Sequence, residues 1–117
     1  MSRFITFSLF ALLLTIPAFA FEWSGRLVDA DCTHKNGGLQ ACDPGLNTTS
    51  FGLVVAGKPY LFDWKGSQKA ALAIKHRAEA GAASNKRLSP TVNASITGER
   101  LGAHKILVKT VTIEPVP

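Results

Sequence analysis

The order of elements in this chain is decided by residues 51–80, which read FGLVVAGKPYLFDWKGSQKAALAIKHRAEA. Residues 51–56 form an apolar run rich in β-branched side chains, and a second apolar run covers residues 60–64. A tight turn beginning at Gly57 would join the two runs. Residues 67–80 are mostly good helix formers and contain no Pro or Gly. The stretch therefore predicts a β-hairpin followed by one helix.

The ends of that helix are marked by residues with known positional preferences. Ser67 is of a type favoured at the N-cap, and Gly81 stands where a helix would stop. Ala71, Ile74 and Ala78 fall on one face and form an apolar stripe of mostly small side chains. Such a stripe allows close packing of the helix on a sheet.

Strand patterns flank this central stretch on both sides. Residues 21–30 suit a half-buried first strand, and residues 91–98 alternate between apolar and polar side chains. The apolar pattern of residues 105–113 changes phase, which predicts a β-bulge near Lys109 and Thr110.

The predicted order is therefore β-β-β-α-β-β, and the fold class is mainly β. Five short strands with one helix between the third and the fourth are typical of the OB-fold, a five-stranded Greek-key barrel. We therefore expect a small OB-fold-like five-stranded barrel with one helix, which requires the first strand to pair with the fourth. A small α+β sheet or a sandwich would have the same order of elements.

The N-terminus predicts export. Residues 1–20 combine the positive charge of Arg3, an apolar stretch over residues 4–16 and a small-residue cleavage pattern at residues 17–20, as in a secretory signal peptide. The apolar stretch is shorter than the roughly 20 residues of a membrane span. The alternative is an uncleaved N-terminal anchor. Cleavage would leave one domain, residues 21–117, in a secreted or periplasmic location.

The composition of the chain supports one folded domain. With 46% hydrophobic residues and 18% charged residues, the chain is too apolar to be disordered. The two cysteines, Cys32 and Cys42, lie in a polar stretch, residues 31–50, that predicts a long structured loop. An even pair of cysteines in an oxidising compartment favours a disulfide, which would stabilise so small a domain by roughly 2.5–3 kcal/mol.

Two short motifs resemble a known family. Residues 24–32, SGRLVDADC, are similar to the Gly-x-Leu-x-Asp-x-x-Cys start of an uncharacterised family of small exported bacterial proteins, and residues 57–63, GKPYLFD, resemble its Gly-Lys-x-Tyr-x-Phe-Asp hairpin. Residues 92–98 and 106–113 match the last two strands of that family loosely. The resemblance implies a secreted OB-like barrel and carries over no catalytic residues. Residues 65–90 form a longer basic stretch than the family pattern predicts.

Charge is concentrated in that stretch. Within residues 65–87, six basic side chains face a single acid, Glu79. The basic residues are Lys65, Lys69, Lys75, Arg77, Lys86 and Arg87. The hypothesis is a binding surface for an anionic polymer or membrane surface, with Arg100, His104 and Lys105 as contributors from the last loop. The alternative is a solvated helix face that keeps the protein in solution. Nucleic acid is a candidate partner without specific support.

The aromatic residues of the hairpin allow two interpretations. Tyr60, Phe62 and Trp64 alternate and would share one face of the third strand. We expect this face, and Trp23 also, to belong to the barrel core, because Asp63 and Lys65 would occupy the opposite, wet face. The alternative is a stacking platform for a ligand.

The cysteine loop is the basis of a second functional hypothesis. Residues of types that bind metals gather there, namely Asp29, Asp31, Cys32, His34, Cys42 and Asp43. They suggest a metal-binding or redox module as the alternative function, although their spacing matches no zinc signature. The sequence contains no Gly-x-Ser-x-Gly elbow and no His-Glu-x-x-His motif. We therefore expect no enzyme, no catalytic residue, no metal and no cofactor. A third possibility is a structural role, in which an open barrel edge pairs with another protein.

Overall fold

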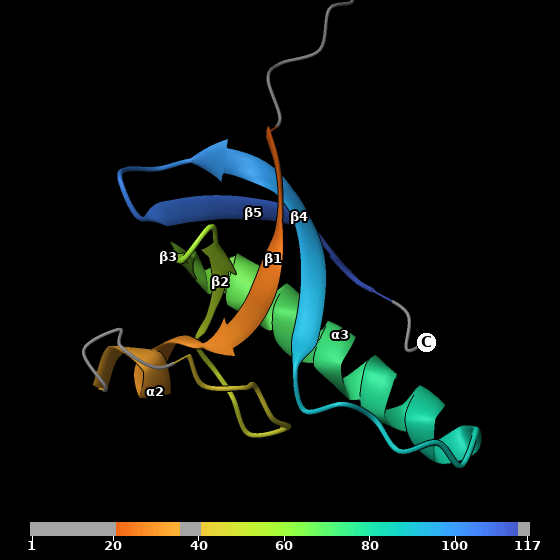
Figure 1. The fold of residues 1–117 in the computed structure, drawn as a ribbon. Helices are drawn as coiled ribbons and strands as arrows, with labels where there is room; N and C mark the ends of the chain where they lie inside the picture. The colour runs from red at the N-terminus through yellow and green to blue at the C-terminus, as the bar shows by residue number, and fades with distance from the viewer. Residues whose placement is uncertain (1–20, 36–40, 115–117) are drawn as a thin grey trace, which may run out of the picture.

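The computed structural model describes residues 21–35 and 41–114, which form one barrel with two helices (Figure 1). The strands are β1 (Phe21–Asp29), β2 (Phe51–Val55), β3 (Lys58–Phe62), β4 (Val92–Arg100) and β5 (Lys105–Ile113). The helices are α2 (Ala30–Lys35) and α3 (Trp64–Ala83). The predicted signal peptide, residues 1–20, lies outside the described residues.

The five strands close into a barrel in the order β1-β2-β3-β5-β4. β1 is antiparallel to β2 and to β4, and its pairing with β4 extends from Phe21 opposite Gly98 to Leu27 opposite Val92. A short parallel pairing of β3 with β5 completes the barrel. The prediction of a mainly β, five-stranded barrel with one main helix is thus confirmed.

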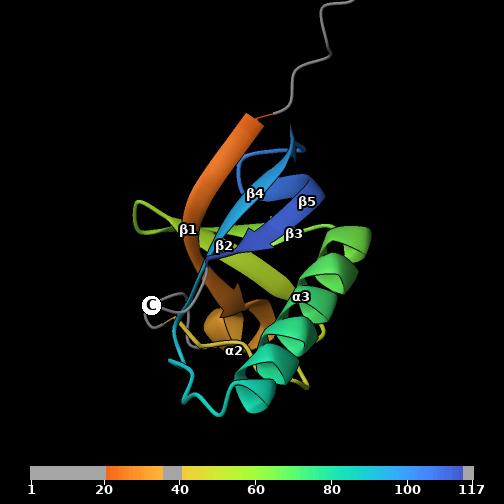
Figure 2. The same ribbon diagram turned by 90° about the vertical axis from the view of Figure 1, so that its right-hand side faces the viewer.

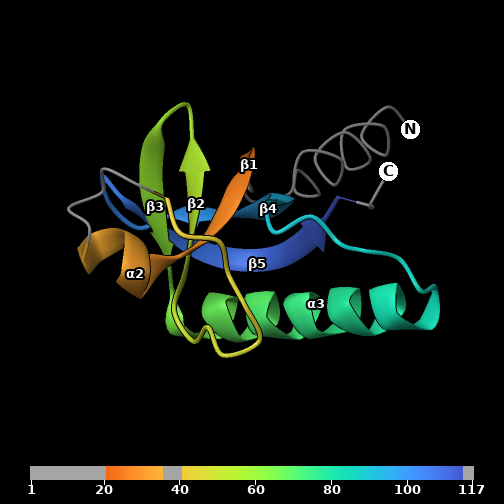
Figure 3. The same ribbon diagram turned by 60° about the horizontal axis from the view of Figure 1, so that its bottom comes forward.

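The core lies inside the barrel and beneath α3. Alternate side chains of each strand point inward, as the period of two requires. The strand residues of this core are Leu27, Phe51, Leu53, Phe62, Val92, Ala94, Ile96, Ile106 and Val108. α3 adds Ala70 and Ile74 from the face that it turns toward the barrel. Figures 2 and 3 show α3 running along the β5 side of the barrel, with its other side facing away from the sheet.

The β2–β3 hairpin turns one residue earlier than predicted. Ala56 and Gly57 both have positive φ angles, 51° and 79°, as a two-residue turn of type I′ requires. β3 therefore begins at Lys58 and ends at Phe62. Trp64 is thus not a strand residue, and the prediction that it continues the aromatic face of the third strand is wrong.

The predicted bulge in the last strand is confirmed. In the β4–β5 ladder, Thr97 lies opposite Thr110 and Gly98 lies opposite Val108, so Lys109 has no opposite residue. The backbone carbonyl of Lys109 instead accepts a hydrogen bond from Lys69 Nζ of α3 at 2.7 Å. The bulge is therefore one of the points at which the helix is fastened to the barrel.

α3 begins three residues before the predicted start. Its N-cap is Asp63, whose backbone N–H donates to the carbonyl of Ile106 and whose Oδ1 accepts from the N–H of Val108. Ser67, predicted as N-cap, lies one turn inside the helix, where its hydroxyl accepts from the N–H of Phe51 at 3.1 Å. Gly66 allows the first turn of α3 to lie close to β5, because a Cβ at this position would lie 2.6 Å from Cβ of Val108.

The helix also ends later than predicted. It continues through Gly81 to Ala83, and the chain then turns at Asn85, whose φ is 53°. The N–H of Asn85 donates to Ala82, and the N–H of Lys86 donates to Gly81, which is the hydrogen-bond pattern of a Schellman motif. Asn tolerates the left-handed conformation that this motif needs, so the helix is not stopped by glycine.

The stretch from residue 31 to residue 50 is not wholly a loop, because α2 occupies its beginning. Asp29, the last residue of β1, accepts a hydrogen bond at Oδ1 from the N–H of Cys32 at 3.1 Å. This is the contact of an N-cap side chain with the third helical residue. A helix of six residues is unstable alone, so its position depends on contacts with the barrel and with the following chain.

Candidate binding surfaces

The outward side of α3 combines two exposed apolar side chains with two lysines. Trp64, Lys65, Leu72 and Lys75 fall within roughly 100° of arc when projected down the helix axis. Of their side chains, Trp64 is 72% exposed and Leu72 is 54% exposed. We call these four residues the α3 outer face. One acid, Glu79, projects within the same arc, one turn beyond Lys75.

Two of the predicted basic residues form hydrogen bonds that hold α3 to neighbouring segments. Lys69 donates to the Lys109 carbonyl, as described above, and Arg77 Nη2 donates to the carbonyl of Ser89 at 2.8 Å. Arg77 therefore points toward the linker that follows α3 and away from the α3 outer face. Its hydrogen bond holds that linker against the helix.

The remaining basic residues of the segment are exposed. Lys65 and Lys75 lie on the α3 outer face, whereas Lys86 and Arg87 follow the helix in the linker. The structure therefore does not gather all six predicted residues in one patch. Five of the six are exposed, Lys69 among them. Of the four that are left after Lys69 and Arg77, two lie on α3 and two lie in the chain that follows it.

Arg100, His104 and Lys105 lie apart from the C-terminal half of α3, at the loop between β4 and β5 (Figure 1). Arg100 donates from Nε and Nη2 to the carbonyls of Gly102 and Ala103, and its guanidinium carbon lies 6.0 Å from the centre of the Tyr60 ring. These contacts associate the loop with β3, so its charges form a second cationic region on the barrel.

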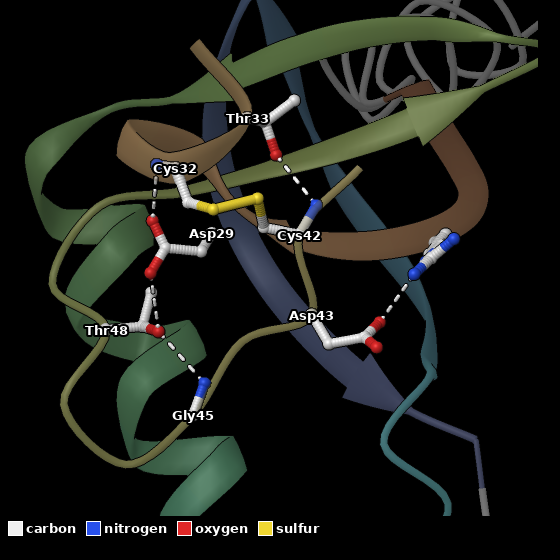
Figure 4. Close-up of a disulfide and its surroundings, with 8 residues drawn as sticks. Asp29, Cys32, Thr33, Cys42, Asp43, Gly45 and Thr48 are labelled. Carbon is white, nitrogen blue, oxygen red and sulfur yellow. Dashed lines mark hydrogen bonds and ion pairs between the residues drawn. A yellow bond between two sulfur atoms is a disulfide. The ribbon is translucent and has the colours of Figure 1, made fainter. Parts of the chain in front are cut away.

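The cysteine loop is organised by a disulfide and three side chains (Figure 4). Cys32 and Cys42 are bonded, as predicted, with their Cα atoms 5.9 Å apart. Thr33 accepts a hydrogen bond from the N–H of Cys42, which fixes the far side of the loop to α2. Asp29 Oδ2 accepts from the Thr48 hydroxyl, whose oxygen in turn accepts from the N–H of Gly45.

These contacts engage four of the six residues on which the metal-binding hypothesis depends. Both sulfurs belong to the disulfide, and both carboxylate oxygens of Asp29 accept hydrogen bonds. Asp43 forms an ion pair with Arg26 at 2.7 Å. Among residues 21–35 and 41–114, no three His, Cys, Asp or Glu side chains are grouped so that they could hold a metal ion.

The aromatic residues of the hairpin separate into two environments. Phe62 is part of the core, and Tyr60 and Trp23 are half-buried against it. Trp64, by contrast, is exposed at the first residue of α3. The sequence pattern missed this surface tryptophan because the alternation of residues 60–64 continues past the end of β3. The signal that could have revealed it is Asp63, a favoured N-cap residue directly before Trp64.

Comparison with known proteins adds no further guide to the site. No family model, no curated protein and no solved structure matches the chain. The resemblance to the exported family stays a prediction. In the part of the chain that the structure describes, neither helix has both the length and the apolar character of a membrane span.

Proposed function

We propose that this protein is an exported, non-catalytic binding module for an anionic polymer or membrane surface, and that an anionic membrane surface is the preferred partner. The observation that carries the proposal is the α3 outer face. Its two lysines supply positive charge, and Trp64 and Leu72 supply exposed apolar side chains beside them.

A membrane surface suits this combination better than a polymer does. Lysines are attracted to anionic headgroups, and each contributes about 1 kcal/mol near such a surface. Tryptophan and leucine side chains insert at the boundary between headgroups and acyl chains, and tryptophan is enriched there. A hydrophilic anionic polymer would bind the lysines, but it has little apolar surface against which Leu72 could be buried.

The barrel supplies the rigid support for this surface. α3 is fastened along its length by Asp63 at its start, by Lys69 at the β5 bulge and by Arg77 at the following linker. A surface helix held in this way presents its outer side without losing backbone conformational entropy on binding. The disulfide is compatible with the predicted export, because disulfides persist in oxidising compartments.

The proposal is tested by removing charge from the α3 outer face. Replacing two lysines, Lys65→Gln with Lys75→Gln, should weaken binding to phosphatidylglycerol-containing vesicles by about 2 kcal/mol, roughly 30-fold. The matched control is Lys35→Gln with Lys58→Gln, which removes the same charge from exposed residues outside α3. Vesicle co-sedimentation measures both. Equal losses for the two pairs would leave only net charge as the cause and would contradict the proposal.

A second variant separates a membrane from a polymer. Trp64→Ala keeps both lysines and removes the largest exposed apolar side chain. It should weaken vesicle binding and leave binding to dextran sulfate unchanged. If it weakens neither, the partner is an anionic polymer and the membrane preference is wrong.

A further inference from the structure

A separate hollow of about 530 Å³ lies on the outside of the barrel, over β1, β2 and β3. Its floor follows one row of the sheet, in which Val28 pairs with Gly52 and Gly52 pairs with Leu61. We call this hollow the strand groove. Its volume falls in the range of roughly 300–1,000 Å³ that small-molecule sites occupy.

The floor of the strand groove is apolar, and a glycine at its centre leaves the space above the sheet open. Gly52 has no side chain to fill the groove, and a Cβ there would lie 2.9 Å from the carbonyl oxygen of Tyr60 and 3.6 Å from Val28. Leu61, next in the row, points outward and is 43% exposed. This side chain lines the hollow and offers apolar surface to a ligand that enters it.

The walls come from two segments that are distant in sequence. α2 forms one wall with Ala30 and His34, and the β4–β5 loop contributes His104 to the other. The first wall is held in place by the Asp29 cap and the disulfide described above. The second is fixed by the carbonyl of His104, which accepts from the N–H of Leu61 at 2.7 Å. The strand groove is therefore preformed.

Charge near the strand groove favours an anion. Lys105 pairs with Leu61 across the β3–β5 junction, and Arg100 lies over the Tyr60 ring beside His104. One carboxylate, Asp31, belongs to the α2 wall. The permanent charges at these positions sum to +1.

From the apolar floor and the cationic end, we propose that the strand groove binds a single small anionic amphiphile, with its apolar body over Gly52 and against Leu61. The anionic group would face the β4–β5 loop, where Arg100, His104 and Lys105 are placed. This site is independent of the α3 outer face, since none of its lining residues belongs to α3.

The test measures binding of decanoate by isothermal titration calorimetry, at concentrations at which decanoate is monomeric. The purified protein should bind decanoate at least tenfold more tightly than decyltrimethylammonium, which has the same chain and the opposite charge. Leu61→Glu should weaken decanoate binding at least tenfold. The matched control is Leu46→Glu, since Leu46 is 71% exposed and does not line the groove.

The outcomes separate this proposal from the proposed function. Leu61→Glu should leave vesicle binding intact, whereas Lys65→Gln with Lys75→Gln should leave decanoate binding intact. Equal affinity for the two amphiphiles would overturn the role of charge. Equal loss in the Leu61 and Leu46 variants, or no loss in either, would show that decanoate binds elsewhere and would overturn the site. Far-ultraviolet circular dichroism checks that both variants fold.

Discussion

Asp63 connects the barrel with α3, and its replacement should destabilise the whole domain. Its N–H donates to the carbonyl of Ile106 at 3.1 Å, and its own carbonyl accepts from the N–H of Ser67 at 2.9 Å, within the first turn of the helix. Its carboxylate accepts from the N–H of Val108 at 2.8 Å. Asp63→Ala preserves the two backbone contacts and removes the third.

The cost of that loss follows from the burial of its partner. Val108 is only 3% exposed, so its N–H would be left without an acceptor and with little access to water. A hydrogen bond to a charged group contributes about 1.5–3 kcal/mol. The carboxylate makes no hydrogen bond to the N–H groups of the helix, so no capping hydrogen bond is lost in addition. We expect Asp63→Ala to lower the free energy of unfolding by about 2 kcal/mol.

The assay is urea unfolding followed by circular dichroism, with Asp63→Asn as the matched control. Asn keeps an oxygen at the position of Oδ1 and loses only the charge, so its cost should be about 1 kcal/mol. For a domain of this size, the Ala variant should also lower Tm by roughly 8–15 °C. The reasoning is refuted if Asp63→Ala is as stable as the wild type, or if Asn and Ala cost the same.

Two other changes test the packing of α3 and the cysteine loop. Gly66→Ala should lower the free energy of unfolding by at least about 1 kcal/mol, because the new methyl group would overlap Val108, whereas Gly45→Ala has open space and should change it by less than about 0.5 kcal/mol. If thermal melts give the two variants equal stability, the close approach of helix and strand is not as described. Cys32→Ser with Cys42→Ser should cost about 2.5–3 kcal/mol in urea unfolding, and a smaller loss than about 1 kcal/mol would show that loop closure contributes little.

Much of the fold could be predicted because local patterns agreed with it. The β2–β3 hairpin has two apolar runs around a glycine that can adopt the φ of a tight turn. The bulge at Lys109 was visible because inserting one residue reverses which side chains point inward, and the apolar pattern changes phase there. The disulfide followed from two cysteines in a chain whose sequence predicts export.

Other features depend on contacts that no local pattern encodes. The helix starts at Trp64 because Asp63 is held by β5, a segment more than 40 residues away. Gly66 argues against a helix at that point on propensity alone, yet close packing on Val108 requires it. α2 was missed because so short a helix depends on a cap and a disulfide more than on its own sequence.

The candidate sites likewise combine features that the local sequence reveals with features that depend on long-range contacts. Charge in residues 65–87 was plain from the sequence, but the internal hydrogen bonds of Lys69 and Arg77 depend on where the β5 bulge and the linker lie. The strand groove could not be predicted, because its floor is a row of residues from three strands whose register is set by long-range pairing.

The central claim is that the α3 outer face docks on an anionic membrane surface. Its most direct test is a salt titration of binding to vesicles of phosphatidylglycerol with phosphatidylcholine, compared with phosphatidylcholine alone. We predict binding to the anionic vesicles that weakens steeply as salt is raised, and little binding to the neutral ones. No binding to the anionic vesicles even at low salt would contradict the claim and would leave the lysines of α3 as ordinary solvated side chains.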